Sequence, residues 1–219
     1  MIPLRDTQPS HSKPYVVMLL IALNVLVFLY EMSLSPMGLN LLFRSWAVVP
    51  DAFQIHTLFT YMFLHGGWMH IIGNMWFLWV FGDNVEDAFG HGRFLFFYVL
   101  CGLAAGLLHL GLNYGSPAPT VGASGAIAGV MGAYLVKFPR SRILTLIPII
   151  VFLTTVEVPA VFMLLYWLLI QIVSGAYSIG QSAAAGGTAW FAHIGGFAAG
   201  VFLGWLWKSR PQPYIASYD

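Results

Sequence analysis

The chain has 219 residues, of which 59% are hydrophobic, 16% aromatic and only 8% charged, and its mean hydropathy is +0.79. This composition excludes a water-soluble globular domain and predicts a polytopic membrane protein. The formal net charge of +1 gives no indication of a nucleic-acid partner. The single cysteine, Cys101, excludes an intramolecular disulfide.

Six apolar stretches are long enough for membrane helices and lack the alternation of barrel strands: 15–31, 66–82, 94–113, 123–137, 158–176 and 189–207. In this six-span scheme Arg44 lies on one side of the membrane. The basic residues on the other side are Arg5, Lys13, Arg93, Lys137, Arg140, Arg142, Lys208 and Arg210. Because cytoplasmic loops are enriched in positive charge, both termini are expected to be cytoplasmic.

The predicted fold class is therefore all-α, a six-transmembrane-helix bundle with a short central fourth helix. The expected organisation is a short cytoplasmic tail over 1–14, a membrane domain over 15–207 and a second cytoplasmic tail over 208–219.

Two apolar segments fall outside these spans. The first external loop, 32–64, is too apolar for a solvated linker and is expected to lie in the membrane interface. Residues 143–156 are short, rich in β-branched side chains and interrupted by Pro148. Counting them as a span would break the charge pattern, so they are expected to form a cytoplasmic interfacial segment. Pro159 suits the first turn of the fifth helix, which follows.

The fourth predicted helix carries the most informative residue. It begins at Ser124 and runs to about Lys137, so its roughly 14 residues span about 20 Å, against about 30 Å of hydrocarbon. The Ser124 hydroxyl is therefore expected below the membrane surface and facing a cavity, where a polar group is a functional candidate. An isolated membrane serine, by contrast, more often bonds to a carbonyl of its own helix.

Three polar residues are expected at one depth. Ser124 and His70 each stand 13 residues before the cytoplasmic end of their helices and His193 stands 15, or about 20 Å from that face. Asn74 lies one turn beyond His70 on the same face, so both side chains can converge on one atom. Stripes of small residues should bring the fourth and sixth helices close enough for Ser124 to meet His193; they are Gly125, Gly129 and Ala133, and Gly196, Gly200 and Gly204.

These positions predict a Ser-His dyad. A serine hydroxyl is a poor nucleophile until an adjacent base takes its proton, and a neutral imidazole is the usual base near pH 7. An oxyanion would be stabilised by the free backbone N–H groups of Ala123 and Ser124 and by the side chains of His70 and Asn74. All eight acidic residues lie in tails, loops or helix ends, which leaves no carboxylate for a triad.

Three motifs together resemble the rhomboid family of intramembrane serine proteases, in its short bacterial six-span form. They are His65-x4-His70-x3-Asn74, Gly122-Ala123-Ser124-Gly125, and Ala192-His193-Ile194-Gly195-Gly196-x3-Gly200. The match covers nearly the whole chain.

The resemblance implies hydrolysis of a peptide bond in or near the transmembrane helix of single-pass membrane proteins. Ser124 would be the nucleophile and His193 the base, and His70 and Asn74 would line the oxyanion hole. It implies no metal and no cofactor, and a bacterial inner membrane as location, with the site open to the external side.

The same resemblance suggests a gate made by the fifth helix, with Trp167 and Gln171, and by the loop at about 177–188. The chain departs from the family at Ala128, where some members carry an aromatic residue that stacks on the catalytic histidine. His193 is therefore expected to be oriented by other packing.

Two other functions remain open. A metal site or proton relay could use His65, His70, His109 and His193, but the i,i+5 spacing of His65 and His70 is not that of helical zinc ligands. At about 140° around the helix from His70, His65 is expected instead to support the neighbouring loop. A non-proteolytic relative could bind membrane helices as a chaperone or escort, although such relatives lack the serine or the histidine.

Overall fold

The computed structural model describes residues 2–149, 152–178 and 189–210. Its elements, in chain order, are β1 (Ile2–Asp6), α1 (Tyr15–Ser33), α2 (Pro36–Trp46), η1 (Pro50–Ala52), α3 (Thr57–Thr60), η2 (Tyr61–Phe63), α4 (Trp68–Phe89), α5 (His91–Leu112), α6 (Ser124–Lys137), β2 (Arg142–Ile149), β3 (Phe152–Pro159), α7 (Ala160–Ser178) and α8 (Trp190–Leu206). The predicted membrane helical bundle is confirmed, and its six spans correspond to α1, α4, α5, α6, α7 and α8.

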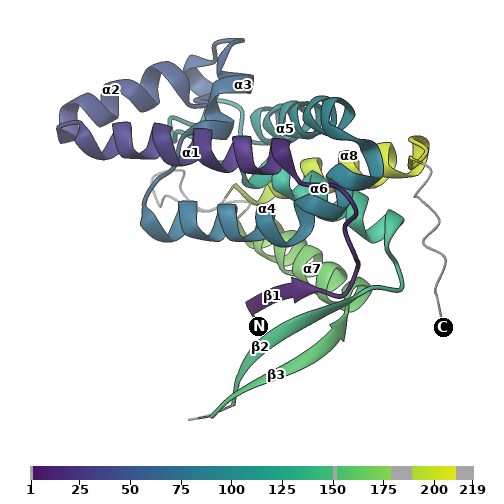
Figure 1. Ribbon diagram of the computed structural model, residues 1–219. Coiled ribbons are helices and arrows are strands. Elements are labelled where there is room, and N and C mark those ends of the chain that lie inside the picture. The colour runs from purple at the N-terminus through teal and green to yellow at the C-terminus, as the bar shows by residue number, and fades with distance from the viewer. Residues whose placement is uncertain (1, 150–151, 179–188, 211–219) are drawn as a thin grey trace, which may run out of the picture.

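Helix α6 lies at the centre of this bundle, among α4, α5 and α8 (Figure 1). Helices α1, α5 and α7 are long and apolar enough to cross a bilayer, whereas α6 and α8 are shorter apolar helices. Every residue of α6 from Gly125 to Tyr134 is buried. A helix that is apolar on all sides belongs in a protein core. The first residue of α6, Ser124, is therefore held well inside the bundle.

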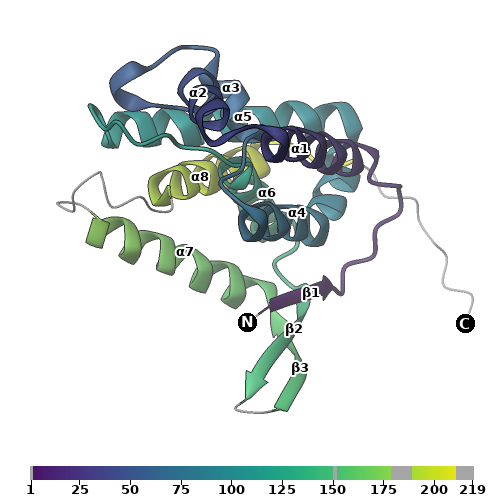
Figure 2. The same ribbon diagram turned by 90° about the vertical axis from the view of Figure 1, so that its left-hand side faces the viewer.

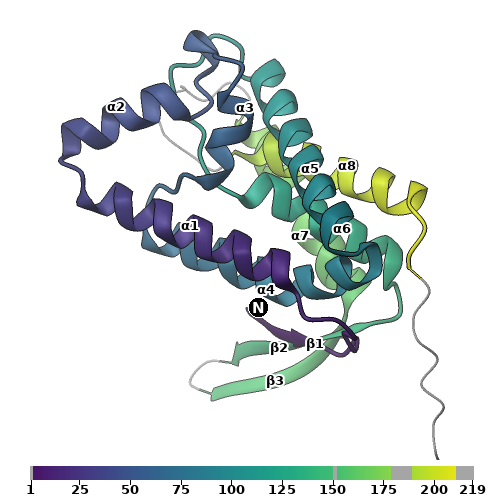
Figure 3. The same ribbon diagram turned by 45° about the horizontal axis from the view of Figure 1, so that its top comes forward.

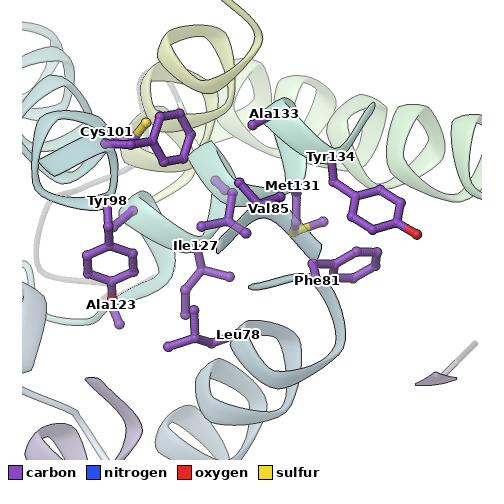
Figure 4. Close-up of a cluster of buried hydrophobic side chains, with 14 of the residues drawn as sticks. Leu78, Phe81, Val85, Tyr98, Cys101, Ala123, Ile127, Met131, Ala133 and Tyr134 are labelled. Carbon is purple, nitrogen blue, oxygen red and sulfur yellow. The ribbon is translucent and has the colours of Figure 1, made fainter. Parts of the chain in front are cut away.

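The core around α6 is filled by large side chains from two neighbouring helices. Leu78, Phe81 and Val85 come from α4 and Tyr98 and Cys101 from α5, and they meet the α6 residues in one buried cluster (Figure 4). All five are 0% exposed. This packing fixes the position of α6 from the side of α4 and α5.

Helix α6 also packs directly on α8 through glycine. A Cβ added at Gly196 would collide with the backbone carbonyl of Gly125, and one at Gly200 would collide with that of Gly129. Only glycine allows two helix backbones to approach this closely. The close approach predicted from the small-residue stripes is confirmed.

The loop over 32–64 is built mainly of α2 and three shorter helical turns. Helix α2 extends away from the bundle at the end of α1 that is remote from β1 (Figure 3). Its Met37, Leu41 and Trp46 are 75%, 61% and 46% exposed. Exposed apolar side chains of this kind suit the expected interfacial position.

The segment expected to be interfacial forms strands instead: residues 143–149 lie in β2 and residues 152–156 in β3, which project together from the bundle (Figure 2). Strands β2 and β3 pair antiparallel from Arg142↔Pro159 to Ile149↔Phe152, and β1 adds a third strand through pairs such as Ile2↔Leu146. The β-branched residues that argued against a helix favour a strand. The all-α bundle thus carries one small sheet.

The first residues are tied to the bundle as well as to the hairpin. The carboxylate of Asp6 accepts hydrogen bonds from the Tyr134 hydroxyl and from Asn84 Nδ2, at 2.5 and 2.7 Å. The carbonyl of Pro3 accepts one from the indole of Trp76. The tail expected over 1–14 therefore contains an ordered strand that contacts α4 and α6.

The helix ends at the sheet side are bonded to one another. The Glu86 carboxylate of α4 accepts hydrogen bonds from the backbone N–H groups of Val16 and Val17, in the first turn of α1, at 2.9 and 2.8 Å. The backbone N–H of Arg210 donates to the carbonyl of Ala88, at the end of α4. Arg210 therefore lies at the end of the bundle where α1 begins and α4 ends.

Candidate active site

The turn that precedes Ser124 is held by backbone contacts. Gly122 has a φ of 125°, a left-handed value that favours glycine. Its N–H donates to the carbonyl of Tyr61, at 2.9 Å. Two residues earlier, Thr120 pairs with Val48 across a β-bridge and its hydroxyl bonds to His109 Nε2 at 2.7 Å. His109 therefore supports the loop that leads into the site.

The Ser124 hydroxyl contacts the imidazole of His193, which lies on α8. Ser124 Oγ and His193 Nε2 are 2.7 Å apart, within hydrogen-bond distance. His193 is 8% exposed. Because Gly125 and Gly196 pack backbone to backbone, α6 and α8 are fixed against each other next to this contact. The packing of the two helices thus sets the distance between the hydroxyl and the imidazole.

The second nitrogen of the His193 ring meets α7. His193 Nδ1 lies 2.8 Å from the amide oxygen of Gln171, and the Trp167 ring packs against the imidazole with 5.6 Å between ring centroids. Trp190 contacts the imidazole edge-on, with 6.4 Å between centroids. The sequence named Trp167 and Gln171 only as parts of a gate. Their i,i+4 spacing puts both on one helix face, and this spacing was the feature of the sequence that could have predicted a contact of both with the same group.

His70 and Asn74 present hydrogen-bond donors beside Gly122. His70 Nδ1 accepts from the N–H of Gly66, at 3.3 Å, so in the neutral ring Nε2 carries the proton. That Nε2 would stand 2.7 Å from a Cβ added at Gly122, and Asn74 Nδ2 would stand 3.5 Å from the same point. Asn74 Nδ2 is buried without a hydrogen-bond partner in the described part of the chain.

These groups line a cavity of about 610 Å³. Its walls come from α4, α6, α7, α8 and the loop before α6, and they include His70, Asn74, Ser124, Trp167 and His193. A hydroxyl, an imidazole and two hydrogen-bond donors therefore face one partly open cavity. An unpaired buried donor is costly unless something completes its bonding, so Asn74 Nδ2 suits an oxygen that occupies the cavity transiently.

His65 differs from its expected position. Helix α4 begins only at Trp68, so helical spacing does not apply to His65, and its ring lies against that of His70 with 5.2 Å between centroids. Its backbone N–H donates to the Glu31 carboxylate. This bond ties the start of α4 to α1.

The gate expected from the sequence is described only in part. Trp167 and Gln171 lie within the described residues, whereas 179–188 lie outside them.

The fold and the site define a helical integral membrane protein with a serine and a histidine in contact inside a cavity. The chain belongs to the rhomboid family, since the Rhomboid domain matches residues 52–210. It is 31% identical to RHOMBOID-like protein 1 of Arabidopsis thaliana over 166 residues, which cover 76% of this chain and 38% of that protein. It is 34% identical to Rhomboid protease GluP of Bacillus subtilis over 130 residues, covering 58% of this chain and 25% of GluP.

The match to RHOMBOID-like protein 6, mitochondrial, of Arabidopsis thaliana is 32% identical over 176 residues, with 77% of this chain and 48% of that protein covered. The chain thus spans less than half the length of each of these three relatives. At family level the relatives connect it with intramembrane proteolysis.

Proposed function

We propose that the protein is an intramembrane serine endopeptidase that cleaves a peptide bond in or near the transmembrane helix of single-pass membrane proteins. The observation that carries this proposal is the 2.7 Å contact between Ser124 Oγ and His193 Nε2 within the cavity. A dyad of this kind needs only a hydroxyl, an adjacent base and donors for the oxyanion.

The chemistry follows the roles of a serine protease. His193 Nε2 takes the hydroxyl proton as Ser124 Oγ attacks the scissile carbonyl carbon, and the protonated ring then gives that proton to the leaving amine. A water molecule, activated by the same imidazole, hydrolyses the acyl-enzyme and frees Ser124. No metal or cofactor takes part in this scheme.

The oxyanion would be held by four donors. His70 Nε2 and Asn74 Nδ2 supply side-chain N–H groups, and Ala123 and Ser124 supply backbone N–H groups at the start of α6, where the helix leaves its first amides without intrahelical partners. The unpartnered state of Asn74 Nδ2 supports this role.

The substrate is expected to be a helix that unwinds locally. A carbonyl inside an intact helix is already bonded and shielded, so Gly or Pro near the cut should favour cleavage. The unwound backbone needs a polar cavity at membrane depth, because lipid offers it no hydrogen bonds. The distribution of basic residues supports cytoplasmic termini and a cavity open to the external side. The resemblance to short bacterial rhomboids supports a location in a bacterial inner membrane.

The test uses the purified protein in detergent with a panel of single-span substrates, whose fragments are mapped by mass spectrometry. We expect Ser124→Ala and His193→Ala each to reduce cleavage to background and the double variant to be no worse, because nucleophile and base act as one unit. Ser33→Ala is the matched control, since Ser33 is exposed and its hydroxyl bonds to a carbonyl of its own helix. Additive losses would contradict a dyad.

A fluorophosphonate probe separates the enzyme from a helix-binding chaperone or escort. Covalent labelling at Ser124, absent in Ser124→Ala, is expected of the enzyme. Binding of substrate helices without labelling or cleavage would favour the escort.

A further inference from the structure

The imidazole of His193 is held by α7 as well as by Ser124. We infer that Gln171 is a positioning residue that keeps the proton of neutral His193 on Nδ1, so that Nε2 is free to receive the proton of Ser124. The inference rests on the proposed role of His193 as the base. It makes α7 part of the assembly that activates the nucleophile.

The orientation of the Gln171 amide is fixed by a contact within its own helix. Its Nε2 lies 3.0 Å from the backbone carbonyl of Trp167, one turn earlier on α7. A carbonyl oxygen can only accept, so the amide nitrogen must face it. The amide oxygen is then the atom that faces His193, and Oε1 lies 2.8 Å from His193 Nδ1. Only this orientation of the amide satisfies both contacts.

The tautomer of His193 follows. An amide oxygen has no proton to give, so Nδ1 must carry the hydrogen of that bond. In a neutral imidazole the other nitrogen is then an acceptor, and that nitrogen, Nε2, lies 2.7 Å from Ser124 Oγ. The hydroxyl therefore donates to the imidazole, which is the direction that proton transfer from Ser124 requires.

The contacts on α7 also hold the ring in place. Gln171 is 4% exposed, and its amide is bonded within its own helix, so it has little freedom to turn away. Trp167, on the same face of α7, packs its ring against the imidazole at an interplanar angle of 37°. This contact provides the aromatic packing that Ala128 on α6 cannot. Gln171 takes the place that a carboxylate has in a Ser-His-Asp triad, with a neutral acceptor.

A consequence concerns the movement of α7. This helix continues directly from β3 and packs on α8 beside the site (Figure 2). Moving α7 away from α8 would remove the Nδ1 acceptor and the Trp167 contact together. The base is therefore in the reactive tautomer when α7 is packed against α8, which couples the position of this helix to the chemistry.

The test compares Gln171→Met, which keeps the length of the side chain without its amide, with Gln171→Glu, which keeps an acceptor. We expect Gln171→Met to slow fluorophosphonate labelling by about 10- to 100-fold, the effect of losing a hydrogen bond to a ring that becomes charged. The loss should fall on kcat for a peptide substrate and leave KM nearly unchanged, while Gln171→Glu should restore most of the rate. Ile172→Ala, an exposed neighbour on α7, is the control and should label normally.

The tautomer is measured directly by 15N NMR of histidine-labelled protein. The chain has seven histidines, so the His193 signals are assigned by comparison with His193→Gln. We expect a protonated Nδ1 in the wild type and in Gln171→Glu, and a loss of this preference in Gln171→Met. A wild-type His193 protonated on Nε2, or a Gln171→Met protein that labels at the wild-type rate, would overturn the inference. The NMR result does not depend on proteolysis, so it tests the tautomer of His193 even if the protein cleaves no substrate.

Discussion

A close backbone contact between α6 and α8 lies next to the candidate nucleophile, and this makes Gly196→Ala an informative change. A methyl group at residue 196 would collide with the carbonyl of Gly125, the residue after Ser124. Ordinary carbon–oxygen contacts are about 3.3–3.6 Å, so α6 and α8 would have to separate by roughly 1 Å or more. A displacement of about 1 Å at a reacting group can cost about 10²-fold in rate.

We therefore expect Gly196→Ala to reduce cleavage and fluorophosphonate labelling by about 10²-fold. The strain of overpacking should also lower the stability by about 1–3 kcal/mol. Gly204→Ala is the control on the same stripe, because its Cβ would stand 3.0 Å from the Cα of Ala133 and need only a slight shift. That variant should keep activity within a few-fold of wild type. A folded Gly196→Ala protein with normal labelling would refute the idea that this glycine contact sets the geometry of the dyad.

Three further predictions concern the donors, a helix terminus and the first strand. Loss of one oxyanion-hole donor typically slows turnover by about 10²–10³-fold, and His70→Ala and Asn74→Ala should each cost less than this because other donors remain. A stable double variant with unchanged turnover would show that both residues have only a structural role. Glu86→Ala should destabilise the protein by about 2–4 kcal/mol in thermal unfolding, because two N–H groups of α1 lose their acceptor, and Glu86→Gln should lose less. Burial raises the pKa of Asp6 above its ordinary 3.8, so its contribution to stability is highest below that value and is lost as pH rises through the raised pKa. The Tm of Asp6→Asn should thus gain on wild type as pH rises above the ordinary carboxyl pKa of 3.8, and a constant difference would contradict this.

The sequence by itself determined the helical bundle and the start of its short central helix at Ser124. Long apolar runs can satisfy their backbone in lipid only as helices, so the six spans follow from composition and length. The position of Ser124 follows from the rise of a short helix, and the approach of α6 to α8 from glycines at four-residue spacing. These features are local or periodic, and a single sequence displays them.

Tertiary structure decided the contacts between residues that are not linked by the periodicity of a helix or strand. Strand β1 pairs with β2 across more than a hundred residues, and the sequence contains no local sign of which strand a tail will join. The ring of His65 lies beside that of His70 because α4 begins after His65, a helix boundary that spacing alone did not fix.

The partner of His193 Nδ1 was decided in the same way. Gln171 reaches it only because α7 packs on α8 with one particular rotation, and that rotation depends on how all the surrounding side chains fill space. Periodicity placed Trp167 and Gln171 on one face of α7. Only the packing of α7 on α8 turned that face toward the imidazole. The direction of the hydrogen bond then decided that the amide oxygen of Gln171 contacts Nδ1, and no residue pattern encodes that direction.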